Sequence, residues 1–243
     1  MIAAVELFDR AFQEVYHVLP DLLCDPEAIS SKEKVLCDFS EELEQLQHKC
    51  RQGISIIFSE EEQLGISQDQ MIAAKEEWKK VFSSVPLSPI FTKLILKIFG
   101  GASWREALSV SKETLDVLYM GAKAVFEAGR FEEAISCFTF LCWFDSKQYD
   151  FWLGLAHSQF RHSDYQSAVS SYGVASGCVP EESWPHIYAA ASFEALGDLE
   201  QASISLRDGI AAEKAKQEPD ALLLQSLSHK LDEYQRGFPA PTT

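Results

Sequence analysis

The stretch GRFEEAISCF, residues 129–138, recurs twice at a spacing of 34 residues. Its counterparts are SDYQSAVSSY at 163–172 and GDLEQASISL at 197–206. Each copy begins with a turn-forming residue, continues with an aromatic residue or leucine, and places an alanine three positions after that residue. A bulky apolar residue follows four positions later. A fixed period of this length indicates one structural unit that the chain builds three times.

The spacing of apolar residues predicts two helices in every unit. Apolar positions recur at helical intervals over 115–128 and 131–144, and the pattern returns in both later copies. Small residues stand where two antiparallel helices must approach each other, namely Ala122, Ala134, Ala156, Ala168, Ala190 and Ala202. A 34-residue helix-turn-helix of this kind is the tetratricopeptide pattern. We therefore predict an all-α fold, an α-solenoid with repeats at about 115–148, 149–182 and 183–216.

Residues 86–235 are predicted to form the repeat domain. Pro219 suits the first turn of one more helix, at about 219–235, whose apolar face caps the end of the stack. Residues 236–243 are expected to be a disordered tail. Residues 1–85 show no echo of the period, so we expect them to form a separate N-terminal helical region that serves packing or dimerisation.

A narrow apolar seam runs along this N-terminal region. Its positions repeat at intervals of seven residues, with two more between them: Leu36, Leu43, Cys50 and Ile57, with Phe39 and Leu46. Heptad spacing occurs where one helix packs against another along its length. Two interpretations stay open at this point. The seam joins two copies in a homodimer, or it packs on the chain's own core.

The charge of the chain argues against nucleic acid as a partner. The sequence has 37 acidic and 21 basic residues, so its net charge of −16 would repel a phosphate backbone. Hydrophobic residues make up 47% of the chain, which favours a folded core. No apolar run approaches the roughly 18 residues of a transmembrane helix, and Glu6 and Asp9 interrupt what a secretion signal would keep apolar. We expect no stable membrane insertion and a cytoplasmic location.

The sequence contains no motif for catalysis or metal binding. Its six histidines and six cysteines lack ligand spacing, and no C-x-x-C pair, phosphate-binding loop or nucleophile motif occurs. The cysteines are expected to be small buried thiols in helices. The sequence therefore predicts a protein that is not an enzyme and that uses no metal and no cofactor.

A binding surface is the remaining candidate for function. In stacked hairpins of this kind the first helices line a concave groove. Repeat geometry aims one set of side chains into that groove: Tyr119, Lys123, Phe126, Leu153, His157, Phe160, Trp184 and Ile187. Most of them are apolar, and exposed apolar side chains in a groove favour a partner that covers them. Alternatively, another helix of the same chain, from the N-terminal region, fills the groove.

Two segments are more specific than the repeat count. GGASWREALSVSKETLDVLY (100–119) leads into the first repeat, and FLCWFDSKQYDFWLGLAHSQF (140–160) joins it to the second. With the repeats, they resemble the class II chaperones of type III secretion, the LcrH/SycD-like translocator chaperones, over about residues 86–235. The resemblance implies a cytoplasmic bacterial protein that holds an extended segment of hydrophobic translocator subunits, often as a homodimer through N-terminal helices. Lys123 stands where the family leads us to expect an aromatic residue.

A generic repeat scaffold is the alternative function, for instance a cochaperone that grips a C-terminal carboxylate. Such a grip needs several Lys, Arg and Asn side chains that converge in the groove. Only Lys123 and Arg161 qualify, and the chain contains no Asn. The sequence therefore favours a chaperone that keeps translocator or effector proteins soluble and competent for secretion.

Overall fold

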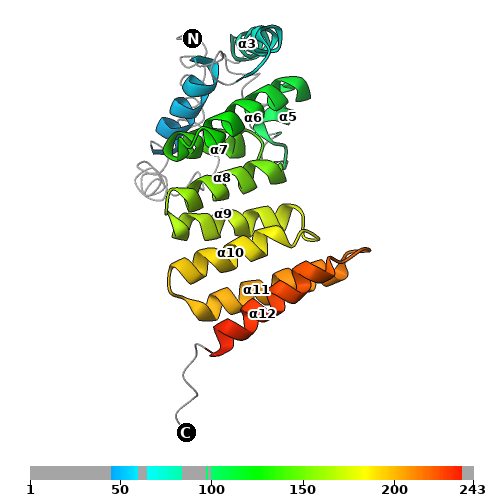
Figure 1. Cartoon of the computed structure of the whole chain (residues 1–243). Helices are drawn as coiled ribbons and strands as arrows, with labels where there is room; N and C mark the ends of the chain where they lie inside the picture. Colours follow the sequence, from blue (N-terminus) through cyan, green and yellow to red (C-terminus); the bar gives the residue numbers. More distant parts are fainter. Residues whose placement is uncertain (1–44, 60–64, 84–96, 98–99, 237–243) are drawn as a thin grey trace, which may run out of the picture. The chain divides into compact units, whose positions relative to one another are not determined.

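The chain folds into α-helices joined by short turns (Figure 1). The computed structural model describes residues 45–59, 65–83, 97 and 100–236. Within these ranges every regular element is a helix, which confirms the predicted all-α repeat fold. The chain divides into two compact units, Met1–Ser146 and Lys147–Thr243. The first repeat hairpin thus groups with the helices that precede it, and the predicted domain boundary after residue 85 stays a prediction.

The second unit consists of two helical hairpins followed by one further helix. Its helices are α8 (Tyr149–Arg161), α9 (Tyr165–Cys178), α10 (Trp184–Ala195), α11 (Leu199–Ala215) and α12 (Ala221–Arg236). They lie in layers that follow the order of the chain (Figure 1). The hairpins coincide with the predicted second and third repeats, and α12 takes the place of the predicted capping helix.

The turn inside each hairpin explains the first position of the repeated stretch. Gly129, Ser163 and Gly197 all have a left-handed backbone, with φ of 77°, 69° and 79°. Glycine adopts this conformation readily, and Ser163 shows that the repeat requires the turn even where no glycine is present. Asp164 and Asp198 follow, and each accepts a hydrogen bond from a backbone N–H of the next helix, at 3.2 and 3.0 Å.

Alanines at the predicted positions are the contact points between helices. In the second unit Ala156 and Ala168 pack in one buried cluster, and Ala190 and Ala202 pack in the next. All four are at most 1% exposed. Because alanine has no side-chain atom beyond Cβ, the helices that meet here approach closely. The paired alanines therefore lie where the repeat register predicts them.

The capping helix α12 is held by an apolar face and by a carboxylate of α10. Leu227 and Tyr234 are buried in the cluster that α10 and α11 form. Glu194 of α10 pairs with Lys230 at 2.7 Å and accepts a hydrogen bond from the Tyr234 hydroxyl at 2.9 Å. The last apolar surface of the stack is covered in this way, as an array of repeats requires.

Glu213 ties together α10, α11 and the start of α12. Its side chain is 4% exposed and pairs with Lys216 at 3.0 Å. It accepts hydrogen bonds from the Ser183 hydroxyl at 2.6 Å and from the Asp220 N–H at 3.0 Å. The Ser183 hydrogen bond, followed by those of Asp220 and Lys216, lowers the pKa of Glu213 to about 2, because each donor favours the charged carboxylate.

The first unit joins the first repeat hairpin to two earlier helices and a short one. These are residues 45–59, α3 (Gln68–Ser83), α5 (Trp104–Leu108), α6 (Lys112–Glu127) and α7 (Phe131–Phe144). The buried Trp78 of α3 lies at the centre, with its ring 5.3–5.8 Å from those of Phe58, Phe140 and Phe144. Side chains from three helices thus share one aromatic core.

Glu77 connects α3 to the beginning of α6. Its carboxylate accepts hydrogen bonds from the Ser111 N–H at 2.9 Å, from the Ser111 hydroxyl and from the Thr114 hydroxyl. Burial acts to raise the pKa of Glu77, but these hydrogen bonds outweigh it, so the pKa is lowered. A negative charge at a helix N-terminus is also favoured by the free N–H groups there.

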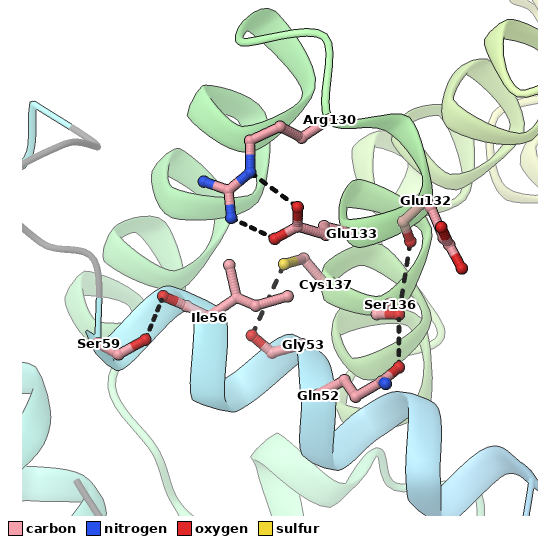
Figure 2. A network of polar contacts seen from close by, with 9 residues as sticks. All are labelled: Gln52, Gly53, Ile56, Ser59, Arg130, Glu132, Glu133, Ser136 and Cys137. Atoms are coloured by element: carbon pink, nitrogen blue, oxygen red, sulfur yellow. Dashed lines mark hydrogen bonds and ion pairs between the residues drawn. The ribbon is translucent and has the colours of Figure 1, made fainter.

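The helix at 45–59 crosses α7 at very short distance (Figure 2). Gly53 makes the crossing possible, because a Cβ at this position would lie 2.7 Å from the Cys137 Cα and would overlap the Ser136 carbonyl oxygen. Polar contacts flank the crossing. The Cys137 thiol donates to the Gly53 carbonyl at 3.6 Å, and the Ser136 hydroxyl donates to the Gln52 side chain at 3.3 Å.

Two residues of the predicted seam are buried within the first unit. Cys50 and Ile57 are 0% exposed, and Leu46 is half-buried. Ile57 touches α6, since its Cγ2 lies 2.9 Å from the position that a Cβ on Gly121 would take. Cys50 and Ile57 therefore pack on the chain's own core. The other three seam residues, Leu36, Phe39 and Leu43, lie outside the described residues, so the dimer seam stays a prediction for them. The predicted disordered tail also lies almost entirely outside the described residues and stays a prediction.

Replacing Gly53 with alanine tests the crossing. The added methyl group overlaps the α7 backbone, so we expect Gly53→Ala to lower the free energy of unfolding by about 1–3 kcal/mol. Gly173, in α9, is the matched control, since a Cβ there meets nothing within 4 Å. Gly173→Ala should instead add about 0.5–1 kcal/mol. Chemical denaturation followed by circular dichroism measures both, and equal effects would contradict the crossing.

Acid should remove the contribution of Glu213 to stability. Its folded pKa of about 2 lies below the usual value near 4.3 of an unfolded chain. The contribution is therefore complete above about pH 4.3 and is lost as pH falls toward 2. At pH 6 we expect Glu213→Gln to unfold at a lower urea concentration than wild type. At pH 3 the difference between the two urea midpoints should be smaller. The control is Glu200→Gln, at an exposed position of α11, whose urea midpoint should equal that of wild type at both pH values. If Glu213→Gln also has the midpoint of wild type at both pH values, the Glu213 carboxylate does not stabilise the fold.

Candidate functional site

Three predicted groove residues lie on one face of α6 in the first unit. Tyr119, Lys123 and Phe126 are spaced four and three residues apart, so their side chains project from the same side of the helix. The rings of Tyr119 and Phe126 lean on two aromatic residues of α7, at centroid distances of 6.2 and 5.5 Å. Both rings are partly exposed. The face is therefore apolar at its two ends.

The helix at 45–59 lies on the other side of α6. It meets α6 at Gly121, two positions after Tyr119, which is the opposite side of a helix with 3.6 residues per turn. Lys123, in the middle of the face, keeps 57% of its side chain exposed beside Glu127, its ion-pair partner at 3.6 Å. The helix at 45–59 therefore does not cover this face of α6, and the alternative that another N-terminal segment fills the groove stays a prediction.

In the second unit, α8, α9 and α10 present a row of aromatic rings. Trp184 stacks on Tyr188 with centroids 5.9 Å apart, and Tyr188 stacks on Tyr172 at 5.7 Å. The His157 ring meets the Tyr188 ring at 4.6 Å. We call these four residues the aromatic row. Trp184 is 43% exposed while Tyr172 is buried, so the row leads from solvent into the space between α8 and α10.

The other predicted groove residues of the second unit lie beside the aromatic row. Leu153 and Phe160 of α8 are partly buried against the cluster of Ala156, Ala168, Tyr172 and Ala189. Ile187 turns toward α11, where its Cγ1 lies 3.2 Å from the position of a Cβ on Gly209. Ile187 thus belongs more to its own hairpin than to an open face. One groove formed by all eight residues would span both units and stays a prediction.

Tyr188 is the residue that the sequence reasoning missed. It links three helices, since its ring contacts His157, Tyr172 and Trp184. The corresponding positions of the first two repeats are Met120 and Gly154, so the alignment of repeats gives no aromatic pattern there. The signal that remained was spacing, because Tyr188 follows the predicted Trp184 by four residues, one helical turn.

Burial favours the neutral form of two members of the aromatic row. Burial lowers the pKa of His157, which favours the neutral imidazole. Burial also raises the pKa of Tyr172. The Nδ1 atom of His157 lies 2.8 Å from the Leu153 carbonyl oxygen, which can only accept, so Nδ1 carries the hydrogen. This face is suited to apolar groups and to single hydrogen bonds rather than to ion pairs.

The described part of the chain offers no arrangement for metal binding. No group of three or more His, Cys, Asp or Glu residues there has the geometry to hold an ion. Burial raises the pKa of the Cys50 and Cys178 thiols, which disfavours the reactive thiolate. That the protein is not an enzyme stays a prediction. None of the described helices is long and apolar enough to cross a membrane.

Solved structures, rather than family models, relate this chain to known proteins. No protein-family model matches it. It is similar to a T3SS complex from Aeromonas hydrophila, with 25% sequence identity, 59% of this chain and 95% of that chain covered, and a TM-score of 0.55. It is also similar to the Yersinia enterocolitica type III secretion translocator chaperone SycD, with 26% identity, 55% and 98% coverage, and a TM-score of 0.50. The resemblance to translocator chaperones is confirmed.

Proposed function

We propose that this protein is a cytoplasmic chaperone of a bacterial type III secretion system. It binds an extended apolar segment of a translocator or effector protein and keeps that protein soluble until secretion. The observation that carries the proposal is the aromatic row, which begins at the 43% exposed Trp184 and ends in the interior between α8 and α10. The similarity to SycD, a translocator chaperone, supports the same conclusion.

An extended segment suits this face for a geometric reason. Its alternate side chains point the same way, so they can enter successive spaces between the first helices of neighbouring hairpins. Rigid aromatic rings offer a large contact area and lose little conformational freedom, and a few of them dominate many interfaces. The face of α6, with Tyr119 and Phe126 on either side of Lys123, is a second surface of the same apolar kind.

The proposal is tested by recovering the partner. A tagged full-length chain is purified from its native cell, and the proteins that adhere are identified by mass spectrometry. Limited proteolysis of the complex then maps the segment that the chain protects. We expect a hydrophobic secreted protein, protected over a short extended stretch. Recovery of a general cytosolic chaperone through its C-terminal carboxylate would instead support the scaffold function.

Truncating Trp184 should weaken binding without unfolding the protein. Trp184→Ala removes the exposed end of the aromatic row, and we expect a loss of about 1–3 kcal/mol of affinity for the mapped segment, roughly five- to a hundredfold in Kd. Fluorescence anisotropy with a labelled synthetic segment measures it.

Ile204 supplies the matched control for this experiment. It is 41% exposed, close to Trp184, but stands on α11, the second helix of its hairpin. Ile204→Ala should leave the affinity unchanged. If both variants lose affinity equally, or if neither loses affinity, the aromatic row is not the binding surface.

A further inference from the structure

His157 occupies the point where α8, α9 and α10 meet. Its ring lies 4.6 Å from that of Tyr188 on α10 and 5.6 Å from that of Tyr172 on α9. The Leu153 carbonyl oxygen, 2.8 Å away, fixes the hydrogen of the neutral ring on Nδ1. Any further proton must therefore bind at Nε2, which at neutral pH is a hydrogen-bond acceptor.

The groups around His157 provide no negative charge for an imidazolium. Tyr172 faces the ring from α9, and Tyr188 faces it from α10. On α8 itself, the side chains one turn away are Leu153, Phe160 and the basic Arg161. Among these neighbours there is no carboxylate, and burial alone already lowers the pKa of the ring. A protonated His157 is therefore disfavoured even before a partner covers it.

We propose that the protonation state of His157 controls how tightly the aromatic row holds its partner, with tight binding to the neutral ring and release on acidification. This inference rests on the proposed function, because it names the regulation of the same face. An apolar segment on the row removes water from the ring, and water is what stabilises the charged form. The segment therefore prefers the neutral protein, and linkage requires that a proton on His157 weaken the segment's binding by the same factor.

The sign and the pH window follow from this argument. The segment lowers the pKa of His157 below its already lowered value in the free protein. Affinity is therefore complete above the ordinary histidine value near 6.5 and falls as pH drops through the lowered pKa of the free protein. Each unit by which the segment lowers the pKa weakens binding about tenfold at low pH. Burial raises the pKa of the neighbouring Tyr172, so that phenol does not act in this window.

The test compares affinities at pH 7.5 and pH 5.0. The probe is a fluorescein-labelled synthetic copy of the segment mapped under the proposed function, and the readout is anisotropy with the full-length chain. Wild type should bind the probe more weakly at pH 5.0 than at pH 7.5, by up to about tenfold for each unit by which the segment lowers the pKa of His157. His157→Gln, which keeps a polar side chain but cannot titrate, should bind nearly equally at both pH values. His162→Gln removes an exposed histidine at the end of the same helix and should behave as wild type.

Each other result has a defined meaning. A wild type without pH dependence, or a His157→Gln variant that keeps it, overturns this inference while the proposed function stands. No binding at either pH in any variant overturns the proposed function, and this inference with it. If His157→Gln does not fold, the His157 ring is titrated by NMR in the wild-type chain with and without the segment. A pKa that the segment lowers upholds the inference, and a pKa that the segment leaves unchanged or raises overturns it.

Discussion

The close approach of helix backbones at residues without bulk is the constraint on which both units depend. In the second unit, paired alanines such as Ala156 and Ala168 mark each crossing and are completely buried. In the first unit glycines also allow close approach, since Gly53 lies against the backbone of α7 and Gly121 lies against the Ile57 side chain. Close packing leaves no space for a larger side chain at these positions. The helices can therefore stack in only one register.

Small residues at the crossings determine where the large residues go. With the crossings closed to them, the aromatic side chains gather between layers of helices. In the first unit they form the core around Trp78, which is fully buried. In the second unit they form the aromatic row, which remains open at Trp184. The same packing rule thus yields a structural core in one unit and a surface that a partner can cover in the other.

The repeat could be predicted from the sequence because its register is local. Turn residues, alanines and apolar spacing all lie within 34 residues, and the helices of the second unit follow that pattern. The site was harder. Ile187 was expected in an open groove, but its side chain packs toward α11, where Gly209 leaves space for it. Tyr188 was missed because its importance comes from rings on two other helices, and no local pattern encodes such contacts.

The helix at 45–59 and the aromatic row differ in what covers their apolar side chains. Cys50 and Ile57 give the helix at 45–59 an apolar side that the first unit itself covers. That helix meets α6 opposite Tyr119, so it adds core without occupying the face that the repeat aims outward. The aromatic row of the second unit, by contrast, stays exposed at Trp184. Under the proposed function, selection of a partner there rests on apolar shape, and one proton on His157 is the smallest change that would alter it.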